Sequence, residues 1–206
     1  MFSHGQSNAR GVAILFSRDI DLKINNFCKD ESGRFLLLDC LIREIHYIIV
    51  NVYAPTIDKV TEQKRFGQYL LNELEQYNSK NIIIGGDFNI ELDRASSEPN
   101  SLKNPMYAKQ ITTLMEMLSL VDIWRLRNPT RKRYTRRERT KYGFSQSRLD
   151  YFIISCHLEY FLKNTDILPS IKSDHSLLCM NLSLVNEPKR GKGTWKLNVS
   201  LLEDED

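Results

Sequence analysis

The sequence predicts one α/β domain in which strands pair mostly antiparallel. Its 206 residues, 41% of them hydrophobic, fit a single domain with a substantial core. Short runs rich in β-branched residues alternate with two longer segments whose apolar residues recur at helical spacing. Because hairpin-like connections are mixed with long helical crossovers, we expect a layered, largely antiparallel sandwich rather than a purely parallel sheet.

Three strands are expected in the first part of the chain, rich in β-branched, aromatic and leucine residues: Val12–Phe16, Arg34–Ile42 and Ile45–Tyr53. Only two residues separate the second from the third, which predicts a hairpin. The expected order after them is a helix over Asp58–Tyr77, a strand over Asn81–Gly85, a polar loop over Ala95–Pro105, a helix over Met106–Leu118, and strands over Val121–Trp124, Arg148–Ser155 and Ser176–Leu184.

The domain is expected to span residues 1–185, and residues 186–206 form an expected linker tail, because periodicity is lost there and Pro, Gly and Lys gather. No apolar run approaches the roughly 20 residues of a membrane helix, so no membrane association is expected. The four cysteines are widely separated and sit in or beside apolar segments, which indicates reduced core thiols in a nuclear or cytoplasmic protein.

Net charge is only +3, but it is unevenly spread. In the segment "RKRYTRRERTK", residues 131–141, seven basic residues accompany one acid. A solvated loop is one interpretation. A surface that faces phosphates, or a nuclear address, is the other, because clustered Arg and Lys displace the counterions of nucleic acids.

The segment "IIIGGDFNI" places Asp87 and Asn89 at the end of a strand. If the chain there is extended, both side chains project to one side while Phe88 points into the core. The two preceding glycines allow another backbone or a phosphate to approach closely. The alternative is a turn in which the two side chains bond their own backbone.

Two later motifs carry a possible acid and histidine pair. Asp150 lies in the apolar segment "SRLDYF", where an unpaired carboxylate would be costly, and His175 in "SDHS" is the obvious partner. A carboxylate fixes the imidazole tautomer and favours its protonated form. A satisfied structural histidine remains the alternative, as does a core position for Tyr53 in "NVYAP".

Together these strand-end residues suit hydrolysis of phosphodiesters, in which carboxylate-bound Mg²⁺ neutralises charge and a second acid deprotonates water. No GxGxxG, Walker loop, GxSxG or CxxC motif supports another chemistry.

The motifs "NVYAP", "IIGGDFN", "SRLDYF" and "SDHSLL", in this order, resemble the endonuclease/exonuclease/phosphatase superfamily, which includes apurinic endonucleases, pancreatic deoxyribonuclease, sphingomyelinases and inositol phosphatases. Within it, "RGVAILFS" and "GTWKLNVSLLEDED" resemble the endonuclease domain of non-LTR retrotransposons of the long interspersed element type. The resemblance covers nearly the whole chain. It implies a four-layer α/β/β/α sandwich with mostly antiparallel sheets flanked by helices, and a Mg²⁺- or Mn²⁺-dependent site at the strand ends.

The resemblance also implies roles for individual residues. Asp87 would activate the attacking water, with Asn89 placing it, and Asp174 would be an acid on the metal side. His175 would bind the scissile phosphate. The other residues with implied roles are Asp150, which orients His175, Tyr53, which contacts the phosphate, Thr135 and Ser147 beside the DNA backbone, and Arg133, Arg136 and Arg137 in the basic segment.

The sequence departs from the family pattern at its start. The family begins with a strand that carries an Asn and a later strand that ends in "QE", whose Glu is a metal ligand, whereas this chain opens at "MFSHGQSNARGVAIL". We therefore expect a sandwich truncated at its N-terminus that holds the metal weakly, because Mg²⁺ binds through carboxylates.

Three functions stay open. The first is a monomeric, DNA-nicking endonuclease domain that uses no small-molecule cofactor besides the metal. The second is a lipid or small-molecule phosphodiesterase of the same superfamily. The third is a catalytically inactive remnant that binds nucleic acid.

Overall fold

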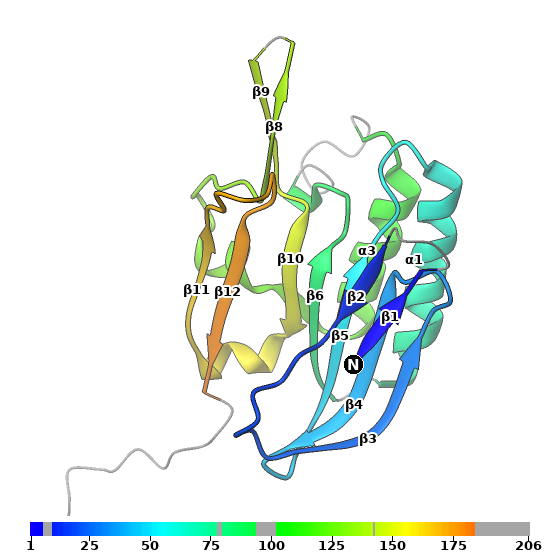
Figure 1. The fold of residues 1–206 in the computed structure, drawn as a ribbon, viewed down its shortest axis with the longest axis vertical. Coiled ribbons are helices and arrows are strands. Elements are labelled where there is room, and N and C mark those ends of the chain that lie inside the picture. The colour runs from blue at the N-terminus through cyan, green and yellow to red at the C-terminus, as the bar shows by residue number, and fades with distance from the viewer. Residues whose placement is uncertain (6–9, 78–79, 94–101, 142, 184–206) are drawn as a thin grey trace, which may run out of the picture.

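The computed structural model describes residues 1–5, 10–77, 80–93, 102–141 and 143–183, and is built around a six-stranded sheet (Figure 1). Its order is β3-β4-β5-β6-β10-β7. Neighbours in it are antiparallel except β5 and β6, which run parallel. The largely antiparallel arrangement expected from the sequence is therefore confirmed. The strands are β3 (Leu22–Lys29), β4 (Phe35–Ile42), β5 (Ile45–Tyr53), β6 (Asn81–Asp87), β7 (Leu120–Asp122) and β10 (Asp150–Ser155).

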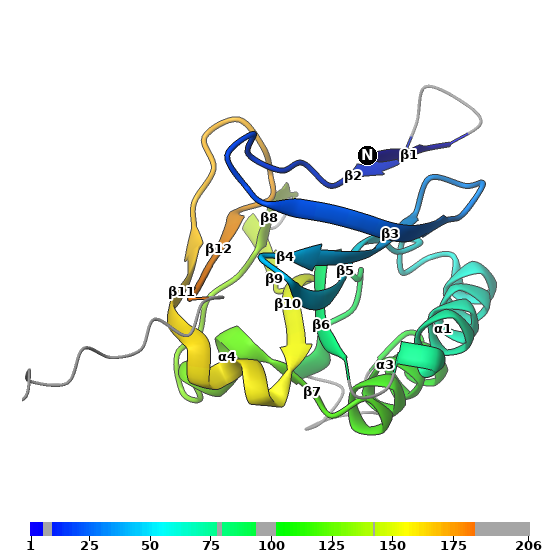
Figure 2. The ribbon, with the colours of Figure 1, turned by 90° about the horizontal axis from the view of Figure 1, so that it is seen from below.

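Two helices, α1 (Val60–Leu74) and α3 (Pro105–Met117), cover one face of this sheet (Figure 2). Side chains alternate along a strand, so Ile82 and Ile84 of β6 enter the core beneath the helices while Ile83 packs on the opposite face. The helices meet that core with apolar stripes that include Leu70 and Ile111. Burial of these stripes fixes the layer of helices against the sheet.

Pairs of short strands cover the other face. The pair β1 (Phe2–His4) and β2 (Gly11–Ala13) lies over β4 and β5, and the pair β11 (Leu162–Leu168) and β12 (Leu177–Leu182) lies beside β10 (Figures 1 and 2). The fold class expected from the sequence, an α/β architecture with a multi-stranded sheet flanked by helices, is confirmed. Three further helices are short: η1 (Glu75–Tyr77), α4 (Ile123–Arg127) and η3 (Cys156–Phe161).

A two-stranded hairpin of β8 (Arg136–Thr140) and β9 (Gly143–Ser147) projects from the body of the domain (Figure 1). Residues Arg136–Thr140 of the basic segment 131–141 form strand β8. The interpretation of this segment as a solvated loop is therefore wrong for these residues. The side chains of the hairpin are largely exposed.

Several elements differ from the sequence expectation. Strand β1 was not predicted, because it has only three residues. Strands β3, β8, β9 and β11 were not predicted either, because they carry many exposed polar residues and lack apolar periodicity. The expected strand Val12–Phe16 is limited to Gly11–Ala13, and Val121–Trp124 divides into the end of β7 and the start of α4. The expected hairpin between β4 and β5 is confirmed, and both turn residues have positive φ, 49° at Arg43 and 63° at Glu44.

Part of the expected polar loop Ala95–Pro105 and the expected tail 186–206 lie outside the described residues. The four cysteines are free; Cys40 is buried, but Cys156 is exposed rather than in the core. Among the described residues, no helix is both long enough and apolar enough to cross a membrane.

Candidate active site

The candidate site forms where the ends of three neighbouring strands meet. Because β5 and β6 run parallel, their last residues, Tyr53 and Asp87, are adjacent in register. Strand β10 runs the other way, so its first residue, Asp150, pairs with Asp87 across the ladder. Sheet register alone therefore brings three of the expected residues to one edge.

Asp87 and Asn89 belong to a tight turn at the end of β6. Asn89 has a φ of 49°, so the chain is not extended there, and the expectation of an extended segment is wrong. The backbone N–H of Asn89 donates to Oδ1 of Asp87 at 2.8 Å, and its side-chain amide donates to Oδ2 at 3.1 Å. The local turn considered as the alternative is thus present, and it holds both side chains together. Phe88 points into the core as expected.

Surrounding residues fix this turn. The side-chain amide of Asn89 also donates to the carbonyl of Ala54 at 2.9 Å, and the buried Gln63 donates to the carbonyl of Asn89 at 3.1 Å. At Gly86, which has a φ of 135°, a Cβ atom would lie 2.0 Å from the carbonyl oxygen of Val52. A glycine is required there, as the close approach expected from "GGD" suggested.

His175 and Asp150 form the expected pair. The Nδ1 atom of His175 lies 2.8 Å from Oδ2 of Asp150. His175 is held by its own N–H, which donates to Oγ of Ser173 at 3.1 Å, and by an antiparallel bridge to Arg136 at the start of β8. The imidazole is therefore positioned both by the loop before β12 and by the base of the hairpin.

The electrostatics of the site are unusual. Burial and the neighbouring Asp150 carboxylate raise the pKa of Asp87 to about 6, although the Asn89 N–H, His175 and Arg136 oppose the shift. The hydrogen bond to Asp150 raises the pKa of His175 above its ordinary value, against the effect of burial. The Asp150 hydrogen bond thus favours the imidazolium form of His175. The neighbouring Asp87 carboxyl, with a pKa of about 6, can gain or lose a proton near neutral pH.

These residues can also hold a cation. One ligand atom from each of Asp87, Asp150 and His175 lies within 4.8 Å of the others. Two carboxylates offer the hard oxygen ligands that Mg²⁺ and Mn²⁺ accept, so the donor set fits such an ion. Asp174 is not part of this group. Its carboxylate is 56% exposed and pairs with Nε of Arg136 at 3.4 Å.

The cluster opens into a cavity of about 820 Å³. This is space for a segment of an extended ligand as well as for a single small molecule. The expected residues Tyr53, Ser147 and Arg136 line it, and so do residues without an expected role. The latter are Thr56, Ile57, Asp58, Glu91, Leu102, Lys103 and Leu149.

Thr135 has a different position from the one the resemblance suggested. It is fully buried, and its hydroxyl accepts the backbone N–H groups of Leu149 at 2.9 Å and Asp150 at 3.1 Å. Thr135 lies beneath the site and holds the start of β10.

The two faces of the hairpin line two different cavities. Arg136 and Ser147 face the site just described, whereas Arg137 and Gln146 line a second cavity of about 440 Å³, together with Lys132 and Arg133. Neither Lys132, Arg133 nor Arg137 forms an ion pair with another described residue. Among the described residues, the cations of this second cavity therefore have no ion-pair partner, although Asp174 also lines it.

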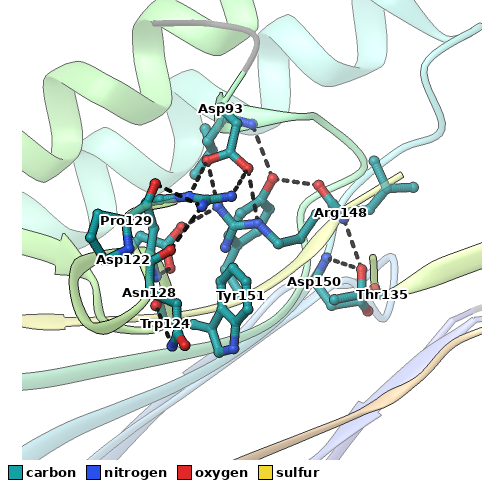
Figure 3. A network of polar contacts seen from close by, with 12 residues as sticks. Asp93, Asp122, Trp124, Asn128, Pro129, Thr135, Arg148, Asp150 and Tyr151 are labelled. Carbon is teal, nitrogen blue, oxygen red and sulfur yellow. Dashed lines mark hydrogen bonds and ion pairs between the residues drawn. The ribbon is translucent and has the colours of Figure 1, made fainter. Parts of the chain in front are cut away.

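Sequence reasoning missed an ionic network behind the site (Figure 3). Arg148 is almost fully buried and pairs with Asp93 and Asp122, and Asp93 also binds Arg125. A signal was available: Arg148 precedes the same apolar run as Asp150 and, like any buried charge, requires partners. Those partners could not be identified, because they lie far away in the sequence.

The sequence is similar to one protein family and to two known proteins. The sequence model of the family described as endonuclease-reverse transcriptase matches residues 47–179. An uncharacterized 149 kDa protein of transposon TX1 from Xenopus laevis is 34% identical over 207 residues, 99% of this chain and 15% of that protein. DNA-(apurinic or apyrimidinic site) endonuclease 2 of Schizosaccharomyces pombe is 25% identical over 215 residues, 92% of this chain and 39% of that protein. The chain spans less than half the length of either relative.

Solved structures share the fold. The endonuclease domain of TRAS1, a telomere-specific non-LTR retrotransposon, superimposes with a TM-score of 0.63 at 15% identity, covering 89% of this chain and 80% of that domain. An AP endonuclease from Archaeoglobus fulgidus gives 0.60 at 21% identity, covering 81% and 71%. At these identities the likeness shows the fold alone.

Proposed function

The chain belongs to the endonuclease-reverse transcriptase family, and we propose from this membership and from the geometry of its site that the domain hydrolyses phosphodiester bonds in DNA. The observation that carries the proposal is the convergence of Asp87, Asp150 and His175 at one edge of the sheet, inside a cavity that Arg136 of the basic hairpin also lines. The proposed product is a nick in one strand that leaves a 3′-hydroxyl, suitable as a primer for reverse transcription.

Each residue at the edge has a role that its environment supports. Asp87, with a pKa of about 6, accepts the proton of the attacking water near neutral pH. Asn89 holds the Asp87 carboxylate in place through two hydrogen bonds. His175, protonated with the help of Asp150, donates to an oxygen of the scissile phosphate, and Tyr53 contacts the same group from the end of β5.

We assign Mg²⁺ or Mn²⁺ to the carboxylates of Asp87 and Asp150, because the protonated imidazole proposed for His175 has no free nitrogen to ligate an ion. Such an ion, when bound, supplies a positive charge that neutralises the phosphate during its reaction. Asp174 was expected on the metal side. Its ion pair with Arg136 supports a different role, in which Asp174 holds the guanidinium at the rim of the cavity.

The proposal of DNA as the substrate rests on the basic residues around the two cavities. Arg136 and Ser147 face the candidate site, whereas Arg137, on the other face of the hairpin, lines the second cavity together with Arg133 from the segment before β8. A polyanion can contact both faces, whereas a small phosphodiester fills only one. A lipid phosphodiesterase would need an apolar rim, so the cationic hairpin favours DNA.

We further propose that the domain acts as a monomer, and that it acts in the nucleus or cytoplasm. Four free thiols suit a reducing compartment. Strand-specific cleavage tests the proposal. A duplex labelled on one strand is incubated with the chain and Mg²⁺, and its products are then offered to a DNA polymerase without phosphatase treatment.

Direct extension of the nicked strand is the expected result. Products extended only after removal of a 3′-phosphate would contradict the proposed bond cleavage. Binding of the duplex without any cleavage would support the inactive binding module instead. The matched control is Asp87→Asn, which removes the proposed base and keeps the shape of the side chain.

A further inference from the structure

The buried guanidinium of Arg148 connects two segments that carry residues of the candidate site. Its Nη2 and Nε atoms bind the two oxygens of Asp93 at 2.8 and 3.1 Å, and Nη2 also pairs with Asp122 at 2.6 Å (Figure 3). The Arg148 side chain is 4% exposed. A buried charge of this kind is tolerated only when its partners are held in place.

The location of Asp93 gives the network its importance. Asp93 follows the turn that contains Asp87 and Asn89, while Arg148 stands just before Asp150 at the start of β10. The Arg148–Asp93 pair therefore ties the chain after one acid to the chain before the other.

Neighbouring contacts repeat the same connection. The hydroxyl of the buried Tyr151 donates to the carbonyl of Ile90 at 2.9 Å and accepts the N–H of Leu92 at 3.0 Å. The N–H of Phe88 donates to the carbonyl of Leu149 at 2.8 Å. The guanidinium of Arg148 stacks over the Tyr151 ring, 4.5 Å from its centroid, so the ionic and backbone contacts are parts of one packed unit.

Thr135 completes the arrangement on the other side. Its hydroxyl accepts the N–H groups of Leu149 and Asp150, so the start of β10 is fixed between Thr135 and the Arg148 network. Movement of this short segment would move the Asp150 carboxylate relative to Asp87. It would also move the acceptor of the His175 hydrogen bond.

We propose that Arg148 is a positioning residue, which sets the separation of Asp87 and Asp150 by pairing with Asp93 and Asp122, and thereby sets the affinity of the group for a divalent cation. The proposal rests on the proposed function for the identity of that group. Changes behind metal ligands typically lower metal affinity about 10- to 100-fold. Arg148 does not line the cavity of the site, so its effect passes through the two segments that carry Asp87 and Asp150.

The test compares Arg148→Lys with Arg125→Lys. Lysine keeps the charge but cannot bind both Asp93 oxygens and Asp122 at once. Arg125 also binds Asp93 in a bidentate manner, but its remaining hydrogen bonds go to the carbonyls of Asn128, Pro129 and Arg131, away from β10. It is therefore the matched control for loss of an Asp93 contact without loss of the connection to Asp150.

Three quantities are measured for each folded variant: Mn²⁺ affinity by titration calorimetry, the resonance of the Nδ1 proton of His175 by NMR, and kcat and KM for DNA nicking. We expect Arg148→Lys to weaken Mn²⁺ binding about 10-fold or more, to shift the His175 resonance, and to lower kcat with little change in KM. In Arg125→Lys, the Mn²⁺ affinity, kcat and KM are expected to stay within about 2-fold of those of the parent chain, and the His175 resonance is expected not to shift.

Unchanged Mn²⁺ affinity and an unshifted His175 resonance in folded Arg148→Lys would overturn the positioning role. Equal effects of the two variants would overturn it as well, since they would indicate general loosening. If Arg148→Lys does not fold, Asp93→Asn takes its place, because it keeps the Arg148–Asp122 pair. A parent chain that does not nick DNA would end the proposed function. In that case the His175 resonance of Arg148→Lys and of the parent chain would still test the positioning role. If the parent chain binds Mn²⁺, the Mn²⁺ affinities of the two chains would test it as well.

Discussion

The Nδ1 atom of His175 lies 2.8 Å from Oδ2 of Asp150, although the two residues are 25 positions apart in the sequence. This contact joins the loop before β12 to the first residue of β10. It places an imidazole with a raised pKa beside Asp87, whose own pKa is raised to about 6. The chemistry proposed for the domain depends on this group, and each of its members can be tested separately.

Replacement of Asp150 by Asn should lower the pKa of His175. The hydrogen bond to Asp150 is the largest cause of the upward shift, and burial alone acts in the opposite direction. The pKa is measured by NMR titration of the His175 ring, with His4 of the same chain as an exposed internal reference. An unchanged His175 pKa in the folded variant would mean that the pair does not stabilise the imidazolium.

The same pair gives a stability that depends on pH. The folded-state pKa of His175 is raised above its unfolded value, so its contribution to the free energy of unfolding is fully present below the unfolded pKa of about 6.5. It is lost as pH rises through the folded-state pKa. In denaturant titrations the stability advantage of the parent chain over His175→Gln should therefore decrease between neutral and alkaline pH. A pH-independent difference would contradict this.

Ionisation of Asp87 should lower the free energy of unfolding as pH rises. Its pKa rises from 3.8 to about 6 on folding, so ionisation of the buried carboxyl destabilises the folded chain as pH increases across that window. With allowance for partial exposure, Asp87→Asn is expected to stabilise the metal-free chain by about 1 to 3 kcal/mol at pH 7, and by much less at pH 4. Denaturant unfolding in EDTA at both pH values measures this difference. A destabilised Asp87→Asn at pH 7 would count against the raised pKa.

Removal of two hairpin cations should weaken DNA binding. Arg136→Ser with Arg137→Ser removes one cation from each face of the hairpin, so the slope of log K against log salt should become shallower by about 2 × 0.9 for duplex DNA. The expected Tm change is small, because both residues belong to an exposed hairpin. The control is Lys64→Ser with Lys109→Ser, on the helices that cover the other face of the sheet. Equal loss of affinity in both double variants would refute a specific role for the hairpin.

The sequence could predict those parts of the fold where apolar periodicity was strong. The hairpin of β4 and β5 and the two covering helices were predicted because their apolar residues are buried. Strand β3 of the six-stranded sheet and strand β8 of the hairpin were missed because pairing with a neighbouring strand, rather than burial, holds each in place, and a single sequence does not reveal a pairing partner.

For the candidate site too, some features could be predicted from the sequence and others could not. Asp87, Asp150 and His175 were identified from motifs at expected strand ends, and their mutual contacts follow from the register of β6 with β10 and from the loop before β12. The turn at Asn89 was considered only as an alternative, because φ cannot be derived from the letters alone. The partners of Arg148 could not be predicted, since they depend on where β7 and the segment after β6 meet in space.

The most direct test of the proposed function is nicking of supercoiled plasmid by the purified chain in Mg²⁺, with EDTA in a parallel reaction and with Asp87→Asn and His175→Ala as controls against contaminating nuclease. We predict nicking that requires Mg²⁺ and falls by about 10² to 10⁴ in Asp87→Asn, the usual contribution of a positioned general base. Nicking that persists in EDTA, or at equal rate in both folded variants, would contradict the assignment of the site. Absence of nicking by folded parent chain would contradict the proposed activity itself.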